Sequence, residues 1–340
     1  MSAEIICNTR CLQASTTGVQ RYTKHMLEGF PTAIKTISPS VHTARGMQGH
    51  LWEQMLLPKQ TRNKLLWSPS NSGPVGAVRQ VVTIHDVVSF DHPELLNKAY
   101  VKWYDYVLPR VCKRAEHLIA ISNFTKQRIM ELFRIPDSKI TVIYNGSDPM
   151  ISVSPTGQGP ALPFSRFVLS LSSLEPRKNI PMLLAAWRNV LQFIPDDVGL
   201  VIVGTSGNSQ VFNESGIGRI PGRVHFTGHL PDEDIAWLYR NALLFTYLSV
   251  YEGFGLPPLE AMSAGVPVLS GNLTAMPEVQ GDAGYMIDPF SLSECEKALI
   301  ELINNDDLRK QLAVKSSSQA AKFSWQKSAQ STFNVLQRFV

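Results

Sequence analysis

The sequence lacks the features that would place it in a membrane or outside the cell. None of its apolar runs approaches the roughly 20 residues that a membrane-spanning helix needs. Its first residues, MSAEIICNTR, place Glu4 before a short apolar run, whereas an export signal has basic residues followed by a longer apolar segment. We therefore expect a cytoplasmic protein, with any membrane association on the cytoplasmic face.

Cysteine is scarce and scattered. No two cysteines have CxxC spacing and none lies in a cluster with histidine, the four being Cys7, Cys11, Cys112 and Cys295. This argues against a disulfide framework and against a structural zinc centre, and reduced thiols fit the cytosol.

Charge of one sign is also nearly absent. The 32 basic and 28 acidic residues leave a net charge of +4, which is too small to predict nucleic-acid binding. It suits an anionic ligand or a light contact with acidic lipid. A GxGxxG run after the first expected strand is missing, so a nicotinamide-dependent dehydrogenase lacks its main support.

What is present indicates two α/β domains. A length of 340 residues with 44% hydrophobic residues provides for two domains of about 150 residues, each with its own core. Short apolar runs alternate with amphipathic stretches, and the runs are continuous, as is typical of parallel strands buried on both faces. We predict two Rossmann-like, doubly wound parallel-sheet domains facing a cleft.

The expected strands are 4–9, 65–70, 80–88, 117–122 and 139–145 in the first half, and 167–172, 199–204, 223–228, 243–249, 267–271 and 284–288 in the second. The clearest helical patterns in the first half cover 19–30, 94–114 and 123–133.

A stretch rich in Gly, Pro and Ser interrupts this pattern between residues 145 and 164 and is typical of a linker. The predicted organisation is an N-terminal Rossmann-like domain over 1–148, a linker over 149–165 and a C-terminal Rossmann-like domain over 166–322. A last helix over 323–340 is expected to pack back on the N-terminal domain.

The run YEGFGLPPLEAMSAGVP carries the clearest chemical signal. It follows an expected strand and leads into a helix. Gly253 and Gly255 let a ligand approach backbone N–H groups closely. Glu252 and Glu260 add two carboxylates, which accept hydrogen bonds from the vicinal hydroxyls of a sugar or ribose. Without any ligand, Glu260 would also suit the positive end of the helix dipole.

The run LEPRKN places two cations, Arg177 and Lys178, at the start of a helix expected near Ile180. The helix dipole repels cations there, so a bound diphosphate would account for them. The alternative is a surface ion pair between Glu175 and Lys178, which contributes little to stability.

Signals in the first half are weaker. His85 and Asp86 end an expected strand, where His85 could donate to a hydroxyl or phosphate with Asp86 orienting it, or the pair could simply cap the strand. Ser122 is a predicted N-cap for the next helix. Gly18 is expected in the loop between the first strand and the first helix, where a substrate could approach the backbone.

One acidic run could be mistaken for a metal site. Asp232, Glu233 and Asp234 match an Asp-x-Asp pattern, but PDEDIAWLYRNA is typical of the acidic first turn of an amphipathic helix. We predict no metal and no cofactor.

The runs VYEGFGLPPLEAMSAGVPV, LEPRKN, HFTGHLPDED and VIYNG resemble the GT-B glycosyltransferases of family 4, the mannosyltransferases among them. The resemblance extends along nearly the whole chain and is strongest over 167–288, where the Glu-x7-Glu spacing is specific. It implies retaining, metal-independent transfer of a hexose from a nucleotide-diphosphate sugar.

The resemblance also implies roles for individual residues. Glu252 would contact the donor sugar and Glu260 the ribose. The diphosphate clamp falls on Arg177 and Lys178, because many members carry a Gly-Arg pair where this chain has Ser172-Ser173. The backbone expected to meet the sugar and diphosphate is that of Gly253, Phe254, Gly255 and Leu256.

Other implied contacts are more peripheral. His85 would lie beside the reacting sugar, and Gly18 near the diphosphate and the acceptor. The loop from Thr227 would meet the base, largely through backbone groups of Gly228, His229 and Leu230. In the implied mechanism the cations and helix N–H groups stabilise the departing diphosphate, and no enzymic nucleophile is needed.

The sequence indicates less about how the acceptor is bound. The segments ARGMQGHLWEQMLLPKQTRNKLLW and 94–114 interleave basic and aromatic residues, which suits a peripheral contact with the inner membrane near a lipid-linked acceptor. An ordinary helix with a solvated basic face explains the pattern equally well. The WEQ segment resembles bacterial transferases that build surface polysaccharide, which implies GDP-mannose as donor and a lipid-linked or oligosaccharide acceptor.

Other functions remain open. A nucleotide-sugar epimerase of the same architecture would convert its donor without an acceptor. A non-catalytic two-domain protein could bind a sugar nucleotide without turnover. A phosphorylase would need pyridoxal phosphate and a longer chain.

Overall fold

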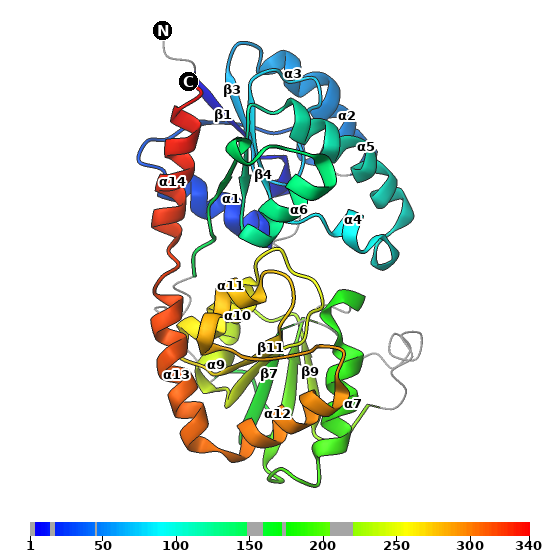
Figure 1. Cartoon of the computed structure of the whole chain (residues 1–340), viewed down its shortest axis with the longest axis vertical. Coiled ribbons are helices and arrows are strands. Elements are labelled where there is room, and N and C mark those ends of the chain that lie inside the picture. Colours follow the sequence, from blue (N-terminus) through cyan, green and yellow to red (C-terminus); the bar gives the residue numbers. More distant parts are fainter. Residues whose placement is uncertain (1–3, 14–17, 45, 148–158, 172–174, 205–219) are drawn as a thin grey trace. The chain divides into compact units, whose positions relative to one another are not determined.

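The computed structural model describes the chain except for residues 1–3, 14–17, 45, 148–158, 172–174 and 205–219. The chain divides into two compact units, which we call the first unit (Met1–Gly146 with Phe323–Val340) and the second unit (Ser147–Lys322). Within the described residues, each unit contains a six-stranded parallel sheet. The predicted α/β class with two Rossmann-like units is confirmed (Figure 1). Most of the segment predicted as a linker lies outside the described residues.

The sheet of the first unit has the order β2-β1-β3-β4-β5-β6. Its strands are β1 (Ile5–Asn8), β2 (Lys35–Ile37), β3 (Leu65–Ser68), β4 (Gln80–Ile84), β5 (His117–Ala120) and β6 (Ile140–Val142). The central strands β1, β3, β4 and β5 are buried along their whole length, which explains their continuous apolar runs.

Two features of this sheet differ from the prediction. Strand β2 was missed because this edge strand is only three residues long and its first two residues, Lys35 and Thr36, are exposed. Strand β4 ends at Ile84, earlier than expected, because the chain turns into a short helix at Val88.

The helices of the first unit are α1 (Gly18–Gly29), α2 (Gly46–Leu51), α3 (Leu57–Gln60), α4 (Val88–Asp91), α5 (Lys98–Arg114), α6 (Asn123–Phe133) and α14 (Trp325–Gln337). Helix α6 has its predicted bounds, and the predicted cap is confirmed, since the Ser122 side chain accepts from the Thr125 N–H. Helix α5 starts later than expected, at the cap Asn97. Gly18 is the first residue of α1, so its expected position in a loop before the helix is wrong.

The last helix belongs to the first unit. In Figure 1 the red α14 runs beside the blue α1, and the two helices pack together. The packing is close at Gly29, where an added Cβ would lie 2.7 Å from that of Ala329. Near the end of the chain, Arg79 donates to the Phe339 carbonyl oxygen.

The sheet of the second unit has the order β12-β11-β10-β7-β8-β9. Its strands are β7 (Arg166–Leu171), β8 (Val198–Val203), β9 (Val224–Gly228), β10 (Leu244–Tyr247), β11 (Val268–Gly271) and β12 (Tyr285–Ile287). Its helices are α7 (Ile180–Val190), α9 (Asp232–Asn241), α10 (Leu256–Ser263), α11 (Met276–Gln280), α12 (Leu292–Asn304) and α13 (Asp306–Ala320). Each of the runs predicted as strands in this half overlaps one of these strands.

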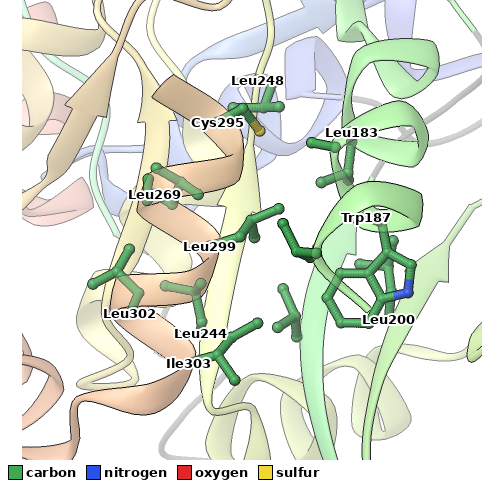
Figure 2. Close-up of a cluster of buried hydrophobic side chains, with 14 of the residues drawn as sticks. Leu183, Trp187, Leu200, Leu244, Leu248, Leu269, Cys295, Leu299, Leu302 and Ile303 are labelled. Atoms are coloured by element: carbon green, nitrogen blue, oxygen red, sulfur yellow. The ribbon is translucent and has the colours of Figure 1, made fainter. Parts of the chain in front are cut away.

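The core of the second unit explains why its strands form where they do. Figure 2 shows Leu183 and Trp187 of α7 opposite Leu299 and Leu302 of α12, with strand residues such as Leu244 beneath them. Burying one such side chain stabilises the fold by about 2 kcal/mol. The sheet is thereby held rigidly, and the loops at its carboxyl edge start from fixed positions.

Candidate functional site

The carboxylate of Glu252 is the centre of a polar cluster in the second unit. Its Oε1 atom accepts from Lys178 Nζ at 2.6 Å and from Arg177 Nη1 at 2.9 Å. The hydroxyls of Tyr247 and Ser249 each lie 2.8 Å from the same oxygen. Burial opposes ionisation of this carboxyl, but the attraction of the two cations outweighs it and lowers the pKa of Glu252 to about 2.

Neighbouring strands bring these residues together. Arg177 follows β7 and Glu252 follows β10, and the two strands pair in parallel, so their carboxyl ends lie at one edge of the sheet. The Arg177 carbonyl oxygen accepts from the Val250 N–H at 2.8 Å and from the Ser249 hydroxyl at 3.0 Å. On the other side, the Glu252 N–H donates to Thr274, which follows β11. The cluster is therefore tied to three loops.

The cations are placed by a tight turn before α7. Arg177 and Lys178 end a 3-10 turn, and Asn179 then adopts a left-handed conformation at the cap of α7. Lys178 is only 12% exposed, and its Nζ lies 4.9 Å from the centre of the Tyr247 ring. Burial lowers the pKa of Lys178, while Glu252 opposes that shift.

The ion pairs differ from the expected alternative. Glu175 is paired with Arg177, whose Nε lies 2.7 Å from Oε2, and Lys178 is paired with Glu252. The surface pair anticipated between Glu175 and Lys178 is therefore wrong. A protein carboxylate also supplies the counter-charge that we had assigned to a diphosphate alone.

The glycine turn between Glu252 and α10 has the geometry that the sequence suggested. Gly255 caps the helix with φ 101°, a conformation that favours glycine, and an added Cβ would lie 2.2 Å from Met276 Cε. Gly253 and Phe254 are buried, and the helix begins at Leu256. The first N–H groups of α10 therefore start at the same sheet edge as the cluster.

Glu260, within α10, has a partner on another helix. It is buried, and its Oε2 lies 2.9 Å from the hydroxyl of Tyr239 on α9. The same hydroxyl lies 3.2 Å from the Pro257 carbonyl oxygen. The contacts of Glu260 thus include a neutral hydroxyl.

The loop predicted to meet a nucleotide base follows the edge strand β9. Gly228 has φ 72°, and an added Cβ would meet nothing within 4 Å. Its carbonyl oxygen accepts from the Gly204 N–H at 2.8 Å, which ties the ends of β8 and β9 together. His229 is exposed and Leu230 is partly buried. Residues 205–219 and the Ser172-Ser173 position lie outside the described residues.

His85 lies in the first unit, just after β4. Its Nε2 is 2.6 Å from the Pro69 carbonyl oxygen, and the ring packs edge-on against Tyr22. Burial lowers the pKa of His85 to about 4, although the bond to Pro69 opposes the shift. A neutral imidazole has one N–H group, and His85 donates it to the Pro69 carbonyl oxygen. Nδ1 can therefore only accept a hydrogen bond. With Nε2 bound to Pro69, a neutral His85 would meet a substrate through Nδ1 as an acceptor, and its place beside a reacting sugar stays a prediction.

Asp86 makes hydrogen bonds just before α4. Its carboxylate accepts from the Val88 N–H at 3.2 Å, at the start of α4, and its carbonyl oxygen accepts from the Asn71 side chain. These contacts match the structural alternative for the His85–Asp86 pair.

The low pKa of His85 predicts a pH-dependent stability. The folded value of about 4 lies below the unfolded value of 6.5, so the unfolded chain binds the proton first as pH falls. Stability is therefore full above pH 6.5 and falls between pH 6.5 and 4, by about 3 kcal/mol for this group. Urea unfolding at pH 7 and pH 4 measures the loss, which should be smaller by this amount in His85→Gln. Equal losses in the two proteins would contradict it.

Four residues of the second-unit cluster were missed at the level of sequence: Tyr239, Tyr247, Ser249 and Thr274. Tyr247 and Ser249 lie two apart at the end of a strand run, next to the glycine turn, and this spacing was the available signal. Tyr239 and Thr274 reach the site from other elements, so nothing in their local pattern indicates a role.

Tyr239 provides a prediction about ligand binding. If Glu260 holds a ribose, Tyr239→Phe loosens one carboxylate oxygen and is expected to raise the donor KM about three- to tenfold. The turnover number should stay unchanged, because the ribose contact is equal in ground and transition states. Steady-state kinetics checks this. Tyr285→Phe is the matched control, since its hydroxyl binds Glu301 at 2.7 Å outside the cluster. A change in turnover alone would contradict the assignment.

The acidic run at 232–234 forms the first turn of α9, as predicted. In the part of the chain that the structure describes, no three His, Cys, Asp or Glu side chains converge as metal ligands would. The four cysteines are free thiols. Among the described helices, none combines the length and apolar content that crossing a bilayer requires.

Comparison with known proteins identifies the family of this chain. Residues 162–319 match the family described as glycosyl transferases group 1, and residues 65–150 match glycosyltransferase family 4. The fold resembles the crystal structure of WaaG, a glycosyltransferase involved in lipopolysaccharide biosynthesis. That match has a TM-score of 0.73 at 16% identity and covers 98% of this chain and 99% of WaaG.

Two relatives from Escherichia coli are similar in sequence. The O-antigen chain mannosyltransferase B is 33% identical over 265 residues, which cover 76% of this chain and 70% of that protein. The serotype-specific mannosyltransferase WbdA is 30% identical over 229 residues, which cover 64% of this chain but only 28% of the relative. By these matches and its two parallel-sheet units, the chain belongs to glycosyltransferase family 4 and has the GT-B fold.

Proposed function

We propose that this protein transfers mannose from GDP-mannose, with retention of configuration, to a lipid-linked or oligosaccharide acceptor of a bacterial surface polysaccharide. The observation that carries the proposal is the contact of Glu252 with Arg177 and Lys178 beside the start of α10. The mannosyltransferase relatives support the choice of sugar and product class. The choice of guanine as the base of the donor comes from the resemblance of the sequence to mannosyltransferases.

The cation pair suits the chemistry of the leaving group. Negative charge builds on the diphosphate as its bond to the sugar breaks, and Arg177 and Lys178 are held in place before that charge develops. Lys178 is mostly withdrawn from water. Its charge therefore interacts more strongly with a bound diphosphate than it would in water. In this proposal the two cations do the work that a metal does in other transferases, and no metal is required.

Glu252 suits the other half of the transition state. Its low pKa keeps it ionised at neutral pH, so it can stabilise the positive charge that develops on the sugar ring. The acceptor oxygen attacks from the face that the diphosphate leaves, and the diphosphate accepts the proton of the acceptor hydroxyl. Glu260 holds the ribose, the loop at Gly228 meets the base, and no enzymic nucleophile takes part.

The first unit carries a surface suited to a lipid-linked acceptor. Met47, Leu51 and Met55 recur every four residues on one face of the helical run 46–60, and are 71%, 52% and 60% exposed. Exposed Lys59 and Arg62 follow them. This arrangement supports peripheral contact with anionic lipid on the cytoplasmic face of the inner membrane.

The second basic segment supports its structural alternative. On α5, Trp103 and Tyr104 pack against the core of the first unit, while Arg110 lies over the exposed Tyr106 ring. This helix is therefore left out of the proposed membrane contact.

The decisive test is a donor panel. Purified protein is incubated with GDP-, UDP- and ADP-sugars, with and without a chelator, and binding and slow hydrolysis are measured. GDP-mannose should stand out, and the chelator should change nothing. Strict dependence on a divalent metal, or no turnover of any nucleotide sugar, would overturn the proposal. Conversion of the donor to an epimer without acceptor would favour the epimerase alternative.

A further inference from the structure

A second buried ion pair lies in the first unit, at residues to which the proposed function assigns no role. The side chain of Glu53 is 0% exposed, and its two oxygens accept from Nε and Nη2 of Arg10, each at 3.3 Å. Asn8 donates to the same carboxylate at 2.9 Å, and Ser72 also donates to it. Asn8 ends β1 and Ser72 follows β3, so this pair lies at the carboxyl edge of the first sheet.

The backbone at Glu53 departs from a regular helix. Residues Trp52–Leu56 form a π-helical turn between α2 and α3, and both Trp52 and Glu53 are buried. Such turns are rare in proteins overall, and those that occur are often found at functional sites. The next residue, Gln54, fixes the loop after β3, because its side chain bonds the Gly73 carbonyl and the Val75 N–H, both at 2.9 Å. The segment is therefore held rigidly around the carboxylate.

Arg10 keeps part of its donor capacity. Two of its nitrogens bind Glu53, and in the described part of the chain Nη1 has no partner. Space for Nη1 comes from Gly49, where an added Cβ would lie 3.1 Å away. The Arg10 side chain is 15% exposed, so part of it is open to a bound molecule.

Two further polar atoms beside this pair are buried and unsatisfied. Among the described residues, neither Nδ1 of His50 nor Nε1 of Trp103 has a hydrogen-bond partner. Their rings lie 4.5 Å apart, and burial together with the charge of Arg10 lowers the pKa of His50. A buried polar atom without a partner is unfavourable and needs an explanation. A ligand that supplies the missing partners is one.

We propose that Arg10, His50 and Trp103 form a subsite for an uncharged sugar residue of the acceptor, with Glu53 as the residue that positions and neutralises Arg10. This inference rests on the proposed function, and it names acceptor-binding residues that the transfer chemistry itself leaves open. Sugar hydroxyls both donate and accept, so one hydroxyl group can satisfy an indole N–H or a bare imidazole nitrogen. The net charge of the Arg10–Glu53 pair is zero, which favours a neutral sugar over a phosphate.

Conservative ring substitutions test the subsite. His50→Phe and Trp103→Phe each keep a ring and remove the unpartnered nitrogen. Each is expected to raise the acceptor KM about tenfold, the effect of one lost hydrogen bond. Donor KM and acceptor-independent donor hydrolysis should stay unchanged, and His50→Phe should not lower the melting temperature. Trp325→Phe is the matched control. Among the described residues its buried Nε1 is also unpartnered, but its ring stacks on His25, which has no part in the proposed subsite.

A binding measurement separates the subsite from the proposed function. Saturation-transfer NMR with methyl α-mannoside and with mannose 6-phosphate needs no turnover. Wild-type protein should bind the neutral probe more tightly, and His50→Phe should lose most of that binding. Tighter binding of the phosphate would overturn the assignment, as would unchanged binding and acceptor KM in both ring variants. If the subsite binds sugar but no donor is turned over, only the proposed function fails.

Glu53 has a distinctive readout as a positioning residue. Glu53→Gln keeps the size of the side chain but leaves the charge of Arg10 uncompensated. The variant is expected to shift its preference toward mannose 6-phosphate severalfold, which a merely loosened loop would not do. Loss of both probes in a folded variant would show that Glu53 acts only as a structural support and would remove it from the proposal.

Discussion

Lys178→Ala is expected to slow transfer about a hundred- to a thousandfold, the usual cost of removing one preorganised group that stabilises transition-state charge. Lys178 lies 2.6 Å from Glu252 and is 12% exposed, so its charge is held in place before the diphosphate begins to leave. The loss should fall mainly on the turnover number, because the charge on the leaving group is larger in the transition state than in the bound donor.

Steady-state kinetics with saturating donor measures this effect. The control is Lys310→Ala, which removes an exposed lysine of α13 that is paired with Asp307 at 3.7 Å. Circular dichroism confirms that both variants are folded. A Lys178→Ala turnover number within threefold of the wild type would remove Lys178 from the mechanism, as would a change confined to donor KM.

Glu252→Gln is expected to have opposite effects on binding and on turnover. In the free protein, Glu252 neutralises one of the two positive charges of Arg177 and Lys178, and an incoming diphosphate must compete for the same donors. The amide removes this competing anion, so GDP should bind about tenfold more tightly, a difference of about 1.4 kcal/mol. Transfer should nevertheless fall about a hundredfold or more, because the sugar ring loses its negative neighbour.

Titration calorimetry with GDP and kinetics with the donor separate the two effects. Glu175→Gln is the matched control, since Glu175 also pairs with Arg177 but its side chain is half exposed. Its effect on both quantities should be small. Weaker GDP binding in Glu252→Gln would show that Glu252 orders the cations and does not compete with the diphosphate.

The two glutamates of the glycine-turn run thus differ in their surroundings. Glu252 is bound by two cations and two hydroxyls, which suits a charge that must stay ionised near a reacting sugar. Glu260 is bound by the Tyr239 hydroxyl, which fixes one oxygen without adding charge. This arrangement suits recognition of a neutral ribose. The eight-residue spacing of the two glutamates does not distinguish their roles. The groups around each carboxylate do.

Much of the fold could be predicted because its strands are buried on both faces. Continuous apolar runs such as those of β4 and β8 are visible in the sequence for this reason. The edge strand β2 was missed because two of its three residues are exposed. Likewise, α5 begins late because its start depends on the cap at Asn97 and not on apolar periodicity.

Taken alone, the sequence determined the two α/β units, the glycine turn before α10 and the presence of two carboxylates and two cations. Those features are local, since each depends on residues within about two helical turns. The tertiary structure alone decided which groups meet. Arg177 and Glu252 are 75 positions apart, and Asn8 and Glu53 are 45 apart. Parallel strands bring such segments to one edge, and no local pattern encodes that pairing.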